Sequence, residues 1–128
     1  MRRRIITTLS ALVFVLSAAT QAETVTPEQF WLQHQSVQQG KPLLIDVRTN
    51  EEFIAGHLPN AINIPYDQID RLSTIAADKS QVIFLYCRSG RRSAIAESSV
   101  LKQGYEHVYN GESYEALLQA LPRSIQPQ

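Results

Sequence analysis

Residues 82–93 read Val82-Ile83-Phe84-Leu85-Tyr86-Cys87-Arg88-Ser89-Gly90-Arg91-Arg92-Ser93. The apolar run at 82–86 is typical of a strand that is buried on both faces, and the residues from 94 onward read as the opening of a helix. A thiol at the end of such a strand, beside backbone N–H groups and guanidinium groups, is well placed to ionise next to an anion. The stretch therefore indicates a cysteine enzyme that acts on a small anionic substrate.

The rest of the sequence alternates strand patterns with helix patterns. Strands are predicted at 42–48, 61–64, 81–86 and 107–109, and helices at 27–39, 50–55, 66–77, 93–103 and 113–121. Thr26 and Thr49 each precede Gln or Glu by three residues, which is the pattern of a capping box at a helix start. Asn110-Gly111 is predicted to form a turn. This alternation predicts a small α/β domain with a mainly parallel sheet flanked by helices on both faces.

The N-terminus has the pattern of a secretory signal peptide. Arg2-Arg3-Arg4 precedes an apolar stretch at 5–19, and Thr20-Gln21-Ala22 supplies the small residues of a cleavage site. The alternative is an uncleaved membrane anchor, but the apolar stretch is shorter than the roughly 20 residues that span a bilayer. The sequence therefore predicts a signal peptide at 1–22, cleaved after Ala22, and a single domain at 23–128.

Charge and cysteine content narrow the function of that domain. Residues 23–128 keep nine Lys and Arg against twelve Asp and Glu, a net charge of about −3. No basic face is left over for a nucleic-acid partner, so the arginines near Cys87 indicate a local site instead. Cys87 is the single cysteine of the chain and cannot form an internal disulfide. No set of residues has the spacing of metal ligands, and we expect neither a metal nor another cofactor.

Two stretches, in the right order, resemble the signatures of rhodanese domains. Residues 45–53 and 56–65 read Ile-Asp-Val-Arg-Thr-Asn-Glu-Glu-Phe and Gly-His-Leu-Pro-Asn-Ala-Ile-Asn-Ile-Pro, like the N-terminal signature of that family. Residues 87–93 resemble its active-site loop, of the form Cys-x-x-Gly-x-Arg. The resemblance covers nearly all of 24–121 and is closest to the short periplasmic, phage-shock type. It implies a rhodanese-like fold and a sulfurtransferase that moves sulfane sulfur from thiosulfate, or a similar anionic donor, to a thiophilic acceptor.

The residues of the loop suit this chemistry. Cys87 is the candidate nucleophile and carrier of the persulfide, because a thiolate must attack the outer sulfur of the donor. The candidate substrate-binding residues, which supply backbone N–H groups and positive charge, are Arg88, Ser89, Gly90, Arg91 and Arg92. Of the last two arginines, one is expected to face the pocket and the other to pair with an acid. The candidate loop-supporting residues are Asp46, Arg48 and Ser93. His57 is expected to pack or cap near Asp46.

Three other functions are compatible with a cysteine in this setting. A cysteine phosphatase or arsenate reductase needs a loop one residue longer, with Arg sixth after the cysteine, where this chain has Ser93. A non-catalytic rhodanese-like binding module usually lacks the cysteine. A persulfide carrier that serves a specific protein acceptor would use the same residues. Residues 110–117 also depart from the Gly-Gly turn and Trp common in the family, and Tyr114 is expected to fill the space of that Trp.

Overall fold

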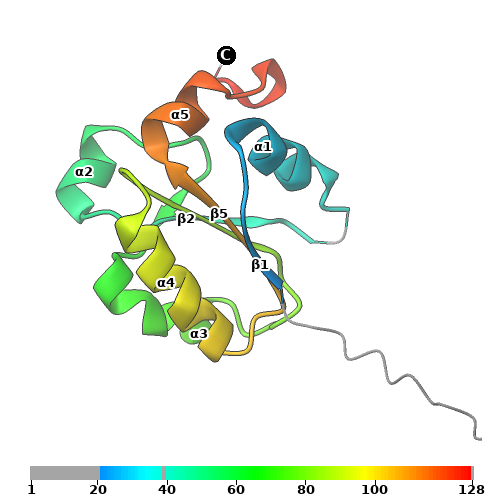
Figure 1. The fold of residues 1–128 in the computed structure, drawn as a ribbon, viewed down its shortest axis with the longest axis vertical. Helices are drawn as coiled ribbons and strands as arrows, with labels where there is room; N and C mark the ends of the chain where they lie inside the picture. The colour runs from blue at the N-terminus through cyan, green and yellow to red at the C-terminus, as the bar shows by residue number, and fades with distance from the viewer. Residues whose placement is uncertain (1–20, 39, 128) are drawn as a thin grey trace, which may run out of the picture.

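The computed structural model describes residues 21–38 and 40–127. In this part of the chain five parallel strands form one sheet, in the order β1-β5-β4-β2-β3 (Figure 1). The elements are β1 (Gln21–Thr24), α1 (Pro27–Ser36), β2 (Leu43–Asp46), α2 (Asn50–Ala55), β3 (Ile62–Asn63), the 3-10 helix η1 (Tyr66–Arg71), α3 (Leu72–Ile75), β4 (Ile83–Cys87), α4 (Arg91–Lys102), β5 (His107–Ser113), α5 (Tyr114–Gln119) and the 3-10 helix η2 (Arg123–Ile125).

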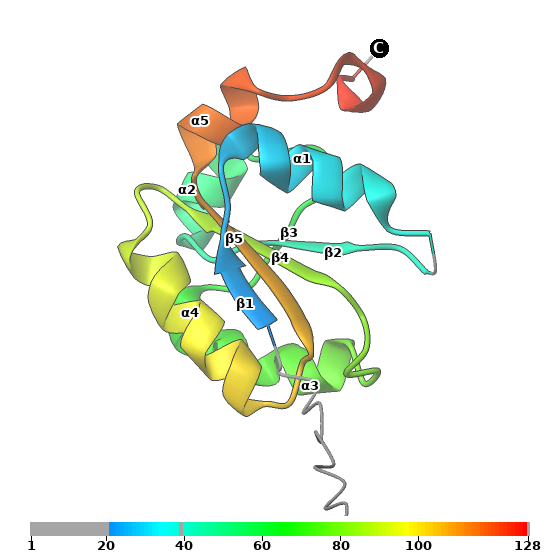
Figure 2. The ribbon, with the colours of Figure 1, turned by 45° about the vertical axis from the view of Figure 1, so that its right-hand side comes forward.

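Helices cover both faces of the sheet, as the sequence predicts. α1 and α5 lie over one face, and α4 and α3 lie over the other (Figure 2). All five residues of β4 are buried, and their side chains alternate between two apolar cores. Phe84 and Tyr86 pack with Phe30, Trp31 and Leu117 under α1 and α5. The other residues of the strand, Ile83, Leu85 and Cys87, pack in the core under α4.

The two predicted capping boxes are present and fix where α1 and α2 begin. The hydroxyl oxygen of Thr26 accepts a hydrogen bond from the Gln29 amide, and the Gln29 side chain accepts one from the Thr26 amide. Thr49 and Glu52 form the same reciprocal pair at the start of α2. α2 therefore begins at Asn50, and only three residues separate it from the end of β2.

The predicted turn at Asn110-Gly111 is wrong, because the chain continues as β5 through these residues. Leu85 pairs with Asn110 and Cys87 pairs with Ser113, so β5 contains one extra residue at this point. Such an insertion is a β-bulge, which re-aims side chains without reversing the chain. Glu112 lies in the bulge with a φ of 64°, and its amide donates to Asn110 Oδ1 at 3.0 Å. The left-handed backbone is thus adopted by the residue that directly follows the Asn110-Gly111 pair.

Other boundaries also differ from the predictions. The predicted helix at 66–77 is the 3-10 helix η1 followed by the single turn α3, and Ile75 is exposed. α4 begins at Arg91 rather than at Ser93. β1 was not predicted, because its residues overlap the predicted signal peptide. Residues 1–20, which hold most of that signal, lie outside the described residues, and its last two residues open β1. No helix in the described ranges is long and apolar enough to cross a membrane.

Candidate active site

The cysteine lies where β4 meets α4. Cys87 is the last residue of the strand, and the helix begins after Gly90, whose φ of 113° favours glycine. The Gly90 amide donates to Cys87 Sγ at 2.9 Å. Sγ also lies 3.3 Å from the hydroxyl oxygen of Ser93, and that hydroxyl donates to the Gly90 carbonyl at 3.1 Å. The chain thus folds around the sulfur, with the Gly90 amide hydrogen directed at Sγ and the Ser93 hydroxyl oxygen beside it.

These contacts favour the thiolate. Burial raises the pKa of Cys87, but the Ser93 hydroxyl and the backbone amides of Ser93, Gly90 and Ser89 stabilise the ionised sulfur and bring its pKa below the ordinary value. The N-terminus of the twelve-residue helix α4 adds positive potential at the same point. Only 1% of Cys87 is exposed, so the loop and the surrounding core enclose the sulfur almost completely.

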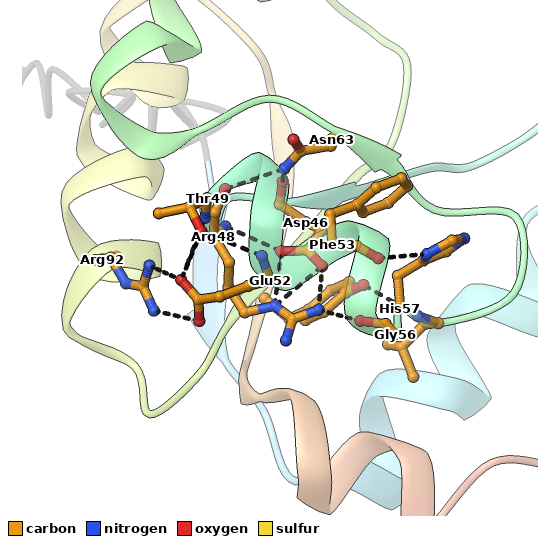
Figure 3. Close-up of polar contacts among 11 residues, drawn as sticks. Asp46, Arg48, Thr49, Glu52, Phe53, Gly56, His57, Asn63 and Arg92 are labelled. Atoms are coloured by element: carbon orange, nitrogen blue, oxygen red, sulfur yellow. Dashed lines mark hydrogen bonds and ion pairs between the residues drawn. The ribbon is translucent and has the colours of Figure 1, made fainter.

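The arginines of the loop differ in their environments. Arg92 donates to both carboxylate oxygens of Glu52, at 2.6 and 3.0 Å (Figure 3). This contact lowers the pKa of Glu52 to about 2 and raises that of Arg92. Arg88 and Arg91 are exposed, and neither takes part in an ion pair within the described part of the chain. Arg92 is therefore the arginine that pairs with an acid, and Arg91 is the one left to solvent.

Asp46 and Arg48 form a buried ion pair at the end of β2. Arg48 Nη2 lies 2.6 Å from Asp46 Oδ2 and also donates to the Gly56 carbonyl at 2.6 Å (Figure 3). The guanidinium group lies over the Tyr114 ring, 4.2 Å from its centroid. Asn63 donates to the backbone carbonyl oxygens of both residues of the pair. The pair thus joins the end of β2 to the C-terminal end of α2, and a separate ion pair, Glu52 with Arg92, joins α2 to the cysteine loop.

His57 lies just after α2 and packs against that helix rather than against the pair of Asp46 and Arg48. Its ring stacks on Phe53, with 3.8 Å between centroids, and Nδ1 lies 2.8 Å from the Phe53 carbonyl oxygen (Figure 3). The residue is exposed. It therefore closes the last turn of the helix, and no contact places it at the sulfur.

A hollow of about 290 Å³ opens beside the cysteine loop. It is lined by Arg48, Glu52, Ala55, Arg88, Tyr114 and Glu115. Sequence reasoning identified the two arginines but not the acids: Glu52 was recognised only as a capping residue, and Glu115 carried no signal. The missed acids matter because they balance the positive charge around the loop.

Comparisons with known proteins identify the family that this chain resembles. The family described as "Rhodanese-like domain" matches residues 28–115. Thiosulfate sulfurtransferase PspE of Escherichia coli (strain K12) is 39% identical over 67 residues, which cover 52% of this chain and 64% of that protein. A sulfurtransferase of Allochromatium vinosum is 44% identical over 69 residues, covering 53% of this chain and 63% of that protein.

A comparison with solved structures points to the same family. A solved structure of a rhodanese with anions from E. coli superimposes with a TM-score of 0.56 and 34% sequence identity, covering 59% of this chain and 89% of that chain. The chain spans less than two thirds of the length of each curated relative named above. The family match extends from the second residue of α1 to the first turn of α5 and includes the whole cysteine loop. The chain belongs to the family of rhodanese-like domains.

Proposed function

We propose that the protein is a sulfurtransferase in which Cys87 carries sulfane sulfur as a persulfide. The Cys87 thiolate attacks the outer sulfur of thiosulfate, the S–S bond of the donor breaks, and sulfite leaves with the bonding electron pair. The persulfide then passes its outer sulfur to a thiophilic acceptor such as cyanide or a thiol, and the Cys87 thiolate is restored. Each step breaks one S–S bond and forms one new S–S or S–C bond, so no external oxidant or reductant is needed.

The observation that carries this proposal is the set of hydrogen bonds at Cys87 Sγ. The Gly90 amide lies 2.9 Å from the sulfur, and the Ser93 hydroxyl lies 3.3 Å from it. A free cysteine thiol has a pKa of about 8.5 and is mostly protonated at neutral pH. The lowered pKa of Cys87 increases the fraction of thiolate, which is the nucleophile. The same donors suit the terminal sulfur of a persulfide anion. The Ser89 amide also favours the ionised sulfur, and the exposed Arg88 and Arg91 supply positive charge in the same loop.

Formation of thiocyanate from thiosulfate and cyanide tests this function. We expect turnover by the purified protein and its loss in Cys87→Ser, which keeps a polar group of similar size but removes the sulfur nucleophile. Release of nitrophenol from para-nitrophenyl phosphate in a Cys87-dependent manner would instead indicate a phosphatase. Absence of turnover with every sulfur donor would contradict the proposed function.

We further propose that residues 1–22 direct export of the protein to the periplasm and are then cleaved off after Ala22. The arginine-rich start and the apolar stretch at 5–19 support this proposal. Cleavage after Ala22 would leave Glu23 and Thr24 to pair with β5, since these residues face Tyr109 and Asn110. The N-terminal sequence of protein recovered from an exporting bacterial host should begin at Glu23, and an intact N-terminus would show an uncleaved anchor.

A further inference from the structure

The bulge in β5 places a carboxylate against the cysteine loop. Glu112 is held with a φ of 64°, a conformation that glycine adopts readily and that is strained for other residues. A Cβ placed on Gly90 would lie 3.3 Å from Cβ, Cγ and Cδ of Glu112. The Glu112 side chain therefore lies along the α-carbon of the same residue whose amide donates to Cys87 Sγ. The glycine leaves the space that this acid occupies.

The other charges around the loop determine how strongly the Glu112 carboxylate repels an approaching anion. Arg92 is paired with Glu52, and Arg48 is paired with Asp46. Two of the arginines near the site are thus already neutralised by acids. An additional negative charge at the face of the loop acts on any anion that approaches the sulfur, because Coulomb interactions over one residue's width are only partly screened by water and salt.

We propose that Glu112 is a specificity-determining residue that disfavours highly charged anions at Cys87 relative to uncharged or singly charged reactants. The effect of Glu112 on the choice of sulfur donor rests on the sulfur transfer proposed above, whereas its effect on charged reactants does not. A donor with one negative charge, such as a thiosulfonate, transfers its outer sulfur to the Cys87 thiolate and leaves as a sulfinate. Glu112 makes that donor more competitive with the dianion thiosulfate.

Alkylation of Cys87 tests the charge effect without sulfur transfer. The thiolate displaces iodide from iodoacetate, an anion, or from iodoacetamide, which is uncharged and of similar size. Because Cys87 is the only cysteine, loss of free thiol reports on this site alone. We expect Glu112→Gln to raise the ratio of the iodoacetate rate to the iodoacetamide rate by about three- to tenfold at low ionic strength, and the effect to shrink in salt.

Two further variants make this test specific. Glu112→Gly removes the same charge and suits the φ of 64°, so it should raise the ratio to the same extent even if the glutamine variant folds poorly. Glu106→Gln makes the same change just before the opposite end of β5 and should leave the ratio as in the wild type. An unchanged ratio in both Glu112 variants would overturn the proposal. Failure of both reagents to reach Cys87 in the folded protein would overturn it as well.

Sulfur donors then separate this inference from the proposed function. In Glu112→Gln we expect kcat/KM for thiosulfate to rise about three- to tenfold more than kcat/KM for methanethiosulfonate. Equal changes for both donors, with sulfur transfer intact, would refute the role of Glu112 alone. No sulfur transfer from either donor, with the alkylation ratio raised as expected, would refute the proposed function and leave the charge effect standing.

Discussion

The Ser93 hydroxyl connects the protonation state of Cys87 to the backbone of the loop. In the thiol form Sγ donates to Ser93 Oγ, and the hydroxyl donates to the Gly90 carbonyl. When the thiol ionises, the sulfur becomes an acceptor, and the hydroxyl can rotate to donate to it. The residue is fully buried, so water does not replace this hydrogen bond when the hydroxyl is removed. Ser93 thereby favours the ionised state.

Ser93→Ala should therefore raise the pKa of Cys87. One hydrogen bond to a charged group corresponds to about 1.5 kcal/mol, so the rate of alkylation by iodoacetamide at pH 6 should fall about tenfold. At a pH well above the thiol titration, the two proteins should react at similar rates. The measurement is the pH profile of the rate. Ser98→Ala on the exposed side of α4 is the control and should match the wild type, whereas an unchanged profile in Ser93→Ala would contradict this role.

At the scale of elements, α2 and α4 are joined by the ion pair between Glu52 and Arg92. The same carboxylate accepts the Thr49 amide in the capping box, so one side chain begins a helix and holds an arginine of the loop. The side chains are 30% and 20% exposed, and such a pair contributes about 1 kcal/mol rather than the larger value of a buried pair. Position 52 thus connects the end of β2 to the start of α4.

Glu52→Gln removes the charge and keeps a residue that is compatible with a capping box. We expect the free energy of unfolding to fall by about 1 kcal/mol at pH 7. The folded-state pKa of Glu52 is about 2 and its ordinary value is 4.5, so the stabilisation is complete above pH 4.5 and is lost as the pH falls toward 2. Urea denaturation should show the difference between wild type and variant shrinking over that range.

Glu51→Gln, in the same first turn of α2 but exposed and outside the ion pair, is the matched control. It should change stability by less and without this pH dependence. A difference for Glu52→Gln that is constant from pH 7 to pH 2 would show that the ion pair does not stabilise the fold.

The start of the β5 bulge packs tightly between α1 and α5. A Cβ on Gly111 would lie 2.6 Å from Phe30 Cδ2 and 2.9 Å from Leu117 Cδ1. Gly111→Ala should therefore lower the free energy of unfolding by about 1–3 kcal/mol. In a Phe30→Leu background the same change should cost less, because the smaller side chain leaves room. A chemical-denaturation double-mutant cycle measures this coupling, and an equal cost in both backgrounds would contradict the packing.

At the scale of the whole molecule, local patterns predicted most of the fold. The strand of Cys87, the capping boxes at Thr26 and Thr49 and the helix-covered parallel sheet are all confirmed. The errors arose where tertiary contacts decide the outcome. Asn110-Gly111 has the sequence of a turn, but pairing with two neighbouring strands keeps it extended.

The candidate site was predicted less completely than the fold. The sequence indicated which residues follow Cys87 but not which acids face them. Glu52 and Arg92 are 40 residues apart, and Glu112 reaches Gly90 only because of a bulge that has no sequence signature. Charge balance at the site depends on such distant pairs, so the net positive character expected from the arginines was overstated.

The central claim is that Cys87 forms a persulfide, and mass spectrometry of the intact protein after incubation with thiosulfate tests it most directly. We expect the mass to increase by one sulfur atom, the increase to locate to the peptide that contains Cys87, and cyanide to reverse it. Cys87→Ser should gain no mass under the same conditions. An unmodified wild-type protein, or an equal gain in the Cys87→Ser variant, would contradict the account.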